Sequence, residues 1–431
     1  MSQTRFMAQF KFIHAADLHI ESPYKGVSKL NDSLGSALVQ HGVKAFESLI
    51  DLTLNEEADF LLIAGDSFDS ESGSLSAQYR FVRGMEKLAQ ADIPVYIICG
   101  NHDPLNSWSD HLELPNNVVL FKAEEVHHHI VKKDDQDIAA VYGVSFGQKE
   151  EYENRAKQFN KVDKTPFAIG LLHGTIAGND AHVPYCPFDM DTLRTSNMDY
   201  WALGHIHKRE ILAEENPTVV YPGNIQGRHF NETGEKGCSV ITVDNGKMID
   251  HSFARLSDVI YEYIEMEVDG MENLSEFTNA LENLKQELSK DCSYLLRIRL
   301  KGKTSLHSIF ADKSEMEALI DEINTQNEYS QRFIYIDKCL NDTLPEIDLE
   351  ARKESSDFIA DLLNRFDQYN DDPDKLKELV DKIMEELSSS KAGRALKDTN
   401  FNETLDNELQ NLLSSAKWKC VDGLLQNSAE S

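Results

Sequence analysis

The sequence predicts an α/β fold in which a large sandwich, residues 1–255, precedes a small α+β domain, 256–342, and a helical C-terminal region, 343–431. Two observations predict the sandwich: short apolar runs recur along the first part, and amphipathic segments with helical spacing separate them. A third observation predicts the other two parts: the sequence pattern changes to alternating apolar and charged residues after residue 255, and to a wholly helical pattern after residue 342. At 431 residues the chain exceeds one ordinary domain.

Five apolar runs of four to six residues are typical of strands buried on both faces. They are rich in aliphatic and aromatic residues and cover residues 10–13, 60–63, 95–98, 167–172 and 200–203. Between the first three runs, apolar residues recur at helical spacing over residues 38–50 and 79–88. The N-terminal part is therefore expected to consist of strand–helix–strand repeats.

A short polar motif follows each of these runs. The five motifs are Asp17-Leu18-His19, Gly65-Asp66-Ser67-Phe68-Asp69, Gly100-Asn101-His102-Asp103, His173-Gly174 and Gly204-His205-Ile206-His207. Because loops leaving several strands converge at the carboxyl edge of an open α/β sheet, these side chains are expected to meet there. They supply carboxylates, an amide and imidazoles, enough to hold two adjacent metal ions with one histidine to spare. That combination predicts a hydrolase.

A single Asp-x-His or Gly-Asp motif is more often a turn than a metal site. Five motifs in order, all at strand ends, favour a site over five separate turns. The run His127-His128-His129 lacks this support and is expected to be a solvated strand or loop. The histidines left unassigned are His14, His41, His111, His251 and His307, whereas His182, in a proline-punctuated loop after His173, is a candidate for the rim of the site.

The motifs resemble those of the calcineurin-like metallophosphoesterase superfamily, and most nearly those of the SbcD-like DNA exonuclease subunits in its YhaO-type branch. The similarity is specific over residues 8–245, where all five motifs are intact. Residues 221–228 also resemble the loop that follows Gly-His-x-His in this branch, and residues 232–237 are expected to turn into a closing strand. The resemblance implies a four-layer metallophosphoesterase sandwich.

The resemblance also implies two sets of metal ligands that share one carboxylate. The shared residue is Asp66; Asp17, His19 and His207 complete one set, and Asn101, His173 and His205 complete the other. Carboxylate oxygens mixed with imidazoles suit Mn²⁺, Fe²⁺ or Zn²⁺ better than Mg²⁺ or Ca²⁺, and the family favours Mn²⁺. Two such ions would activate water for in-line attack on phosphorus.

His102 is then the spare histidine and is expected to protonate the leaving oxygen, which in a 3′ to 5′ exonuclease is the ribose 3′ oxygen. Asp69 is a candidate for orienting a metal ligand or His102 by hydrogen bonding, with a plain turn residue as the alternative. Asp103 has the same two interpretations. Candidates for substrate contact are the basic residues nearest the motifs and the rim histidine: Arg228, Arg194, Lys208, Arg209 and His182.

Residues 256–342 change to an α+β pattern. Apolar and charged residues alternate over 264–268 and 296–301, acidic in the first segment and basic in the second, as in half-buried strands that pair across a ladder. Amphipathic helices are expected over 274–288 and 316–323, and a further strand over 333–336. The resemblance assigns this unit to the capping domain that shapes DNA access in SbcD-like nucleases.

Residues 343–431 are expected to be helical. Amphipathic faces run over 358–366, over 376–387 behind the start signal Asp372-Pro373, and more weakly over 405–413. Either these helices pack on one another, or an apolar stripe docks on the coiled coil of an SbcC-like ATPase. The chain has no Gly-x-x-x-x-Gly-Lys-[Ser/Thr] motif, so any ATP-driven step requires another chain.

The net charge conflicts with stand-alone DNA binding. Lys and Arg total 43 against 74 Asp and Glu, a formal net charge of −31, whereas phosphate contacts favour a basic protein. Three functions stay open. The motifs favour a DNA repair nuclease that works with the ATPase; a phosphodiesterase or phosphatase for a small molecule or phosphoprotein is the alternative. A non-catalytic scaffold is disfavoured because no expected ligand is missing.

Cellular location and assembly complete the expectations. Six cysteines are scattered without Cys-x-x-Cys spacing, which predicts reduced thiols in a cytoplasmic protein. No signal-peptide core and no apolar stretch of spanning length occurs, so neither secretion nor membrane insertion is indicated. DNA, the ATPase and a second copy of the chain are the expected partners.

Overall fold

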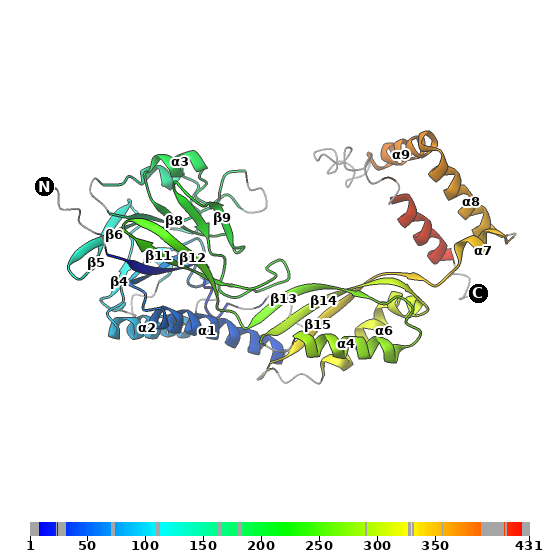
Figure 1. The fold of residues 1–431 in the computed structure, drawn as a ribbon, viewed down its shortest axis with the longest axis horizontal. Coiled ribbons are helices and arrows are strands. Elements are labelled where there is room, and N and C mark those ends of the chain that lie inside the picture. The colour runs from blue at the N-terminus through cyan, green and yellow to red at the C-terminus, as the bar shows by residue number, and fades with distance from the viewer. Residues whose placement is uncertain are drawn as a thin grey trace. The chain divides into compact units, whose positions relative to one another are not determined.

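The computed structural model describes residues 8–22, 24, 32–69, 74–108, 113–162, 166–178, 183–288, 291–325, 329, 332–355, 357–388, 409 and 412–424 (Figure 1). The chain divides into two compact units. The first comprises Met1–Tyr263, Gln286–Leu296 and Gln326–Tyr335, and the second comprises Ile264–Lys285, Arg297–Thr325 and Ile336–Ser431. The domain boundaries after residues 255 and 342 stay predictions.

Two six-stranded sheets form the first unit. In the first sheet, four parallel strands adjoin an antiparallel pair in the order β12-β11-β1-β2-β3-β4: β12 (Lys247–Arg255), β11 (Gly237–Asp244), β1 (Phe10–Ala15), β2 (Phe60–Ala64), β3 (Val95–Ile98) and β4 (Val118–Leu120). The second sheet has four parallel strands flanked by antiparallel edges in the order β5-β6-β7-β8-β10-β9: β5 (His127–Lys133), β6 (Gln136–Gly143), β7 (Ala168–His173), β8 (Tyr200–Gly204), β10 (Thr218–Tyr221) and β9 (Glu210–Ala213).

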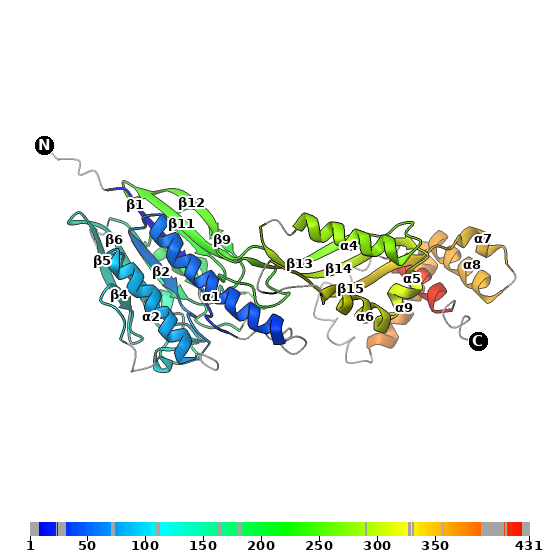
Figure 2. The same ribbon diagram turned by 90° about the horizontal axis from the view of Figure 1, so that it is seen from below.

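The layers confirm the predicted sandwich. An apolar core separates the two sheets, and in it the Phe12 and Phe60 rings stack at 5.0 Å while Tyr200 meets Phe12 edge-on. Helices α1 (Asp32–Asn55) and α2 (Leu75–Gln90) lie side by side along the other face of the first sheet (Figure 2). The short helix α3 (Met190–Thr195) and the 3-10 turn η2 (Arg155–Gln158) cover the outer face of the second.

The five predicted runs are strands β1, β2, β3, β7 and β8, and their side chains are almost entirely buried. Burial on both faces explains why they lack the polar alternation of half-exposed strands. The histidine run forms β5, an edge strand with mostly exposed side chains, as predicted for a solvated strand.

A three-stranded sheet, in the order β13 (Val259–Glu267), β14 (Ser293–Thr304) and β15 (Ile334–Pro345), begins in the first unit and continues in the second. The second unit also contains α4 (Leu274–Leu288), α5 (His307–Ala311) and α6 (Lys313–Asn324). One ion pair joins the two predicted segments, with Lys301 of β14 2.6 Å from Glu265 of β13. Arg299 of β14 pairs instead with Asp342 of β15, at 2.7 Å.

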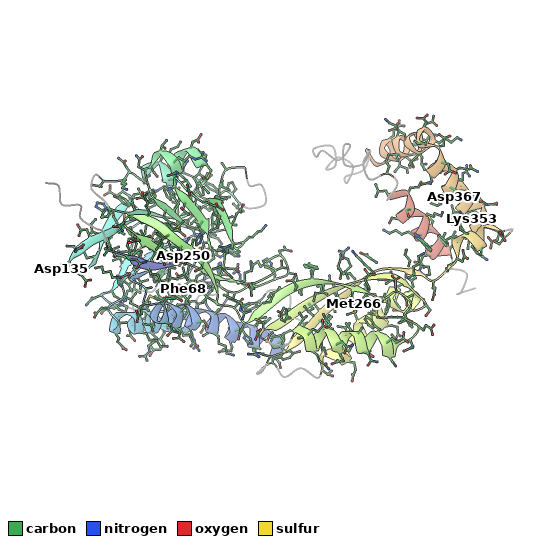
Figure 3. The ribbon with its side chains drawn as sticks, in the orientation of Figure 1. Phe68, Asp135, Asp250, Met266, Lys353 and Asp367 are labelled. Carbon is green, nitrogen blue, oxygen red and sulfur yellow. The ribbon has the colours of Figure 1, made fainter. Side chains whose placement is uncertain are left out.

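The C-terminal part of the second unit is helical. It contains α7 (Leu349–Lys353), α8 (Phe358–Asp371), α9 (Pro373–Ser388) and a helix over residues 412–424. Ile359 and Leu363 of α8 pack on Val421 of the last helix. Asp367 pairs with Lys417. It also pairs with Lys353 (Figure 3). Of the helix predicted over residues 405–413, most residues lie outside the described part.

Two further expectations concern the whole chain. All six cysteines are free thiols, as predicted, and four of them are buried. Within the described residues, no helix combines the length and apolar character needed to span a bilayer.

Candidate metal centre

The predicted ligands lie in the first unit, in the segments that end strands of both sheets. The loops are joined by backbone hydrogen bonds: Asp17 N donates to Gly65 O and His19 N to Asp66 O, each at 3.0 Å. Asp17 accepts the backbone N–H of His205 at 3.1 Å, which ties the loop after β1 to the loop after β8. Ligands from both sheets are thus held against one another by the backbone.

Four of these residues adopt the left-handed backbone region that non-glycine residues rarely occupy. The φ angles are 51° at Asp17, 43° at His19, 54° at Asp66 and 98° at His205. Such conformations cost free energy and persist only where surrounding structure imposes them. Their concentration at these loops marks a functional site.

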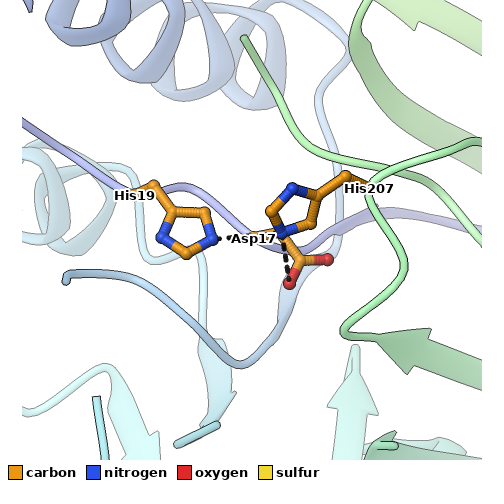
Figure 4. Close-up of side chains that lie close together, drawn as sticks. All are labelled: Asp17, His19 and His207. Carbon is orange, nitrogen blue, oxygen red and sulfur yellow. Dashed lines mark hydrogen bonds and ion pairs between the residues drawn. The ribbon is translucent and has the colours of Figure 1, made fainter. Parts of the chain in front are cut away.

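Three side chains form the first ligand cluster (Figure 4). The Nε2 atoms of His19 and His207 are 3.2 Å apart, and His207 Nε2 is 3.9 Å from Asp17 Oδ1. All three residues offer ligand atoms within 4.8 Å of one another. Burial and the nearby charge of Asp66 raise the pKa of Asp17, while burial lowers the pKa of His19.

The second cluster converges on the side-chain oxygen of Asn101. This oxygen is 3.0 Å from His173 Nε2 and 3.0 Å from His205 Nδ1. His173 donates its Nδ1–H to Ala64 O at 2.8 Å, which leaves the lone pair of Nε2 available to a cation. Burial lowers the pKa of His173 and brings that of His205 to about 3, so both rings are in the neutral form that binds metals.

Asp66 lies between the two clusters. Its Oδ2 is 3.8 Å from His19 Nε2 and 3.5 Å from His173 Nε2, while its Oδ1 accepts the backbone N–H of His102 at 2.8 Å. The carboxylate is 1% exposed. Although burial raises its pKa, the neighbouring His173 and His102 hold the pKa below the ordinary value. Asp66 therefore lies within reach of both clusters, and its bridging role stays a prediction.

Glycines in the motifs allow this close approach. A Cβ on Gly204 would lie 1.9 Å from Ala64 O in the other sheet, and a Cβ on Gly100 would lie 2.3 Å from Asp66 Oδ1. A larger residue at 204 would push the two sheets apart, and one at 100 would displace the Asp66 carboxylate. The motif glycines are therefore part of the site geometry.

The residues beside the ligands fall into two roles. Asp69 Oδ1 is 3.1 Å from His102 Nδ1, so the orienting interpretation of Asp69 has a contact to support it. Asp103 is buried and accepts the backbone N–H groups of Asp66, Ser67 and Gly100 at 3.0, 2.8 and 2.7 Å. It holds the loops that carry ligands without reaching the site itself. Burial raises the pKa of Asp103 to about 8.

The loop after β10 contributes residues that sequence reasoning missed. Glu232 was expected only in a turn, yet its Oε1 lies 2.6 Å from His207 Nδ1. Arg228, a predicted substrate contact, lies 3.4 Å from the same ring and is largely buried. Nothing in the local pattern singles out Glu232, because its partner is 25 residues away in the chain.

The remaining candidates are not brought into either cluster by any described contact. Arg194 pairs with Asp191 of its own helix, Arg209 lies over the Phe253 ring, and Lys208 is exposed. His182 lies outside the described residues. Of the unassigned histidines, His14 is a buried structural residue that bonds Tyr200 and Leu203 O.

A two-sheet sandwich with clustered aspartate and histidine ligands at its strand ends defines a class of metal-dependent hydrolase. The family described as calcineurin-like phosphoesterase matches residues 10–209 of this chain. The "Uncharacterized metallophosphoesterase YhaO" of Bacillus subtilis is 37% identical over 330 residues, which cover 76% of this chain and 81% of that protein. The chain belongs to the calcineurin-like metallophosphoesterase family.

More distant similarity extends to two archaeal proteins named "DNA double-strand break repair protein Mre11". The protein of Thermoplasma acidophilum is 25% identical over 291 residues, covering 64% of this chain and 75% of its own length. That of Methanocaldococcus jannaschii is 24% identical over 287 residues, covering 64% and 74%.

Proposed function

We propose that this metallophosphoesterase uses two metal ions to cleave phosphodiester bonds in DNA, as a 3′ to 5′ exonuclease and endonuclease subunit that works in repair with an SbcC-like ATPase. The observation that carries the proposal is the position of Asp66, whose Oδ2 lies 3.8 Å from His19 Nε2 and 3.5 Å from His173 Nε2, with His102 beside it. Mn²⁺ is the proposed cation because the donor set mixes carboxylate oxygens with imidazoles.

The residues present fit two divalent cations. Neutral imidazole nitrogens of His19 and His207 face each other at 3.2 Å, and the buried carboxylates of Asp17 and Asp66 lie beside them. Buried carboxylates this close are costly without compensating positive charge. When bound, two such cations supply the charge that activates water and holds phosphate oxygens.

His102 is suited to hand a proton to the leaving oxygen. Burial lowers its pKa, but the hydrogen bond to Asp69 and the charge of Asp66 outweigh burial, and the net shift is upward. With Nδ1 donated to Asp69, the proton on Nε2 is the one available to the leaving group. The side chain is partly exposed, which permits contact with substrate.

Arg228 is suited to bind a phosphate oxygen. Its buried Nε has no hydrogen-bond partner among the described residues. Its charge also acts on Asp17, His19 and His102, which places the guanidinium at the first cluster. An anionic substrate would satisfy this donor and offset its desolvation.

DNA as substrate is supported by the relatives named for double-strand break repair. A partner is supported by α9, on which Leu379 and Val380 are half-buried and Ile383 is 47% exposed. Residues 256–342 are proposed as the cap that shapes access. The acidic composition favours the alternative, a small phosphodiester or phosphoprotein substrate, because a net charge of −31 repels a long polyanion.

The test is Asp66→Asn, assayed with Mn²⁺ on bis-p-nitrophenyl phosphate and on linear duplex DNA. Loss of the shared carboxylate weakens both clusters, so both activities should fall more than tenfold while the fold persists. The matched control is Asp92→Asn, which makes the same chemical change at an exposed turn residue with a similar φ of 55°. Mn²⁺-dependent activity above a tenth of wild type in Asp66→Asn would contradict the two-metal assignment.

The two assays also separate the candidate substrates. Wild-type cleavage of the small diester with no cleavage of DNA, even with the ATPase partner and ATP present, would favour the alternative function.

A further inference from the structure

Glu232 is a buried carboxylate surrounded by hydrogen-bond donors. It is 6% exposed and lies in the loop between β10 and β11. Its Oε1 lies 2.6 Å from His207 Nδ1 and 3.2 Å from His229 Nε2. Its Oε2 accepts Asn224 Nδ2 at 2.9 Å and the backbone N–H of Arg228 at 2.8 Å. Both oxygens are therefore engaged, each with different partners.

The carboxylate decides which nitrogen of His207 carries a proton. Its Oε2 accepts two N–H groups, and its Oε1 faces two histidine rings and the Arg228 guanidinium, an arrangement that suits the ionised carboxylate. An ionised carboxylate only accepts hydrogen bonds, so His207 Nδ1 must donate. The lone pair on Nε2 then points toward Asp17 and His19.

The backbone of His207 is fixed by the same loop. Its carbonyl oxygen accepts Lys236 Nζ at 3.1 Å and the backbone N–H of Asn224 at 3.3 Å. Lys236 is itself buried, so this contact is shielded from water. His207 is thus held at its ring and at its carbonyl by residues 224–236.

We propose that Glu232 is a positioning residue for the first metal cluster: it fixes the tautomer and ring orientation of His207 and, through its second oxygen, the backbone of Arg228. One carboxylate would then hold both His207, a proposed metal ligand, and Arg228, whose guanidinium is proposed to bind phosphate. This inference rests on the two-metal function proposed above. The second cluster, Asn101, His173 and His205, has no described contact with Glu232 and should be independent of it.

Glu232→Gln is the discriminating variant. It keeps the size of the side chain but leaves one acceptor oxygen where two are used, and its NH₂ group would face a donor. Glu235→Gln is the matched control, because Glu235 lies in the same segment, is 55% exposed and contacts only Arg255 in the described pairs. Thermal melting of both variants checks the fold.

The first measurement is Mn²⁺ binding by calorimetry on the full-length protein. The His207→Gln variant identifies the Mn²⁺-binding step of the first cluster, because that step should be lost in it. In Glu232→Gln, the Mn²⁺ affinity of this step should weaken about 10–100-fold, the usual effect of losing a partner of a metal ligand. The other step should match wild type, as should both steps in Glu235→Gln. Unchanged binding in Glu232→Gln would overturn the proposal, and so would equal weakening of both steps.

The second measurement needs no metal. In protein labelled with ¹⁵N-histidine, the His207 signal, identified by its absence in His207→Gln, should report a protonated Nδ1 in wild type. In Glu232→Gln that preference should be reduced or lost. An unchanged tautomer would overturn the positioning role. If wild type binds no Mn²⁺ but the tautomer shifts, the two-metal proposal fails while the Glu232–His207 contact stands.

Discussion

Of the two ring nitrogens of His102, only Nδ1 has a hydrogen-bond partner among the described contacts. Nδ1 meets Asp69 at 3.1 Å, and the ring lies edge-on to His19 with centroids 5.0 Å apart. The backbone N–H of His102 donates to the bridging Asp66. The residue is therefore fixed beside the predicted ligands; because His19, Asp69 and His102 could also hold a cation together, the metal content of a His102 variant separates the two roles.

This geometry predicts that His102→Ala keeps two bound metal ions by elemental analysis but loses about 10²–10⁴-fold in DNA cleavage rate, the usual effect of removing a general acid. The loss should be far smaller on bis-p-nitrophenyl phosphate, because nitrophenolate leaves without protonation. His127→Ala, at an exposed histidine of the edge strand, is the control. An equal loss on both substrates, or loss of metal, would remove this role from His102.

At the residue scale, the sequence pointed to residues that converge where a motif and a strand end coincide. The fold brings together the side chains of all seven predicted ligands, and their metal-binding role stays a prediction: Asp17, His19, Asp66, Asn101, His173, His205 and His207. Glu232 and Lys236 were not identified, because their importance comes from contacts with His207 that only the folded loop creates. Asp103 was left between two interpretations, since accepting three backbone N–H groups leaves no trace in the local sequence.

At the scale of elements, the apolar side chains of the helical C-terminal part differ in how far they are buried. Ile359 and Leu363 of α8 are covered by the helix over residues 412–424. On α9, Leu376 is buried but Ile383 is 47% exposed. On α8, Phe358 is 67% exposed, so internal packing covers only part of each apolar face, and part of the α9 stripe stays accessible for a partner.

Ile383→Asp should weaken binding of an SbcC-like ATPase at least tenfold in a pull-down or surface-binding assay, because a charge in an apolar contact must be desolvated. The melting temperature should change little, since Ile383 is already half exposed. Lys382→Asp adds an acidic group one residue away and should leave binding nearly intact. Normal partner binding by Ile383→Asp would show that the stripe has no docking role.

Element identity was predictable from periodicity, whereas sheet order was not. The runs before the motifs specify buried strands, and the alternation around Lys301 and Glu265 specifies a half-buried ladder. The pairing of β1 with β11, which joins Phe10 to Val243, depends on contacts more than 200 residues apart. Local patterns carry no information about such a partner.

At the scale of the whole molecule, charge limits how the chain meets DNA. Many basic side chains are already paired with acids, as Lys11 is with Glu56 and Lys161 with Asp199. Against a net charge of −31, Arg228 supplies positive charge at the site itself. Most of the affinity for a long polyanion would then come from another subunit.

The isolated chain should therefore bind duplex DNA weakly, and a plot of log affinity against log salt concentration should have a shallow slope of about −1 to −2, since each phosphate contact adds roughly −0.9. Addition of the ATPase partner should steepen that slope. Fluorescence anisotropy across a salt series measures both. A steep slope for the chain alone would mean that a basic groove overrides the net charge.

Each ligand cluster draws on both sheets of the sandwich. Asp17 and His19 come from the first sheet and His207 from the second, while Asn101 faces His173 and His205 across the same divide. A cation bound at either cluster would contact residues of both sheets. Its binding free energy would therefore also oppose separation of the two sheets. Because side chains from both sheets meet in each cluster, a change in the packing of the two sheets would alter the geometry of both clusters together.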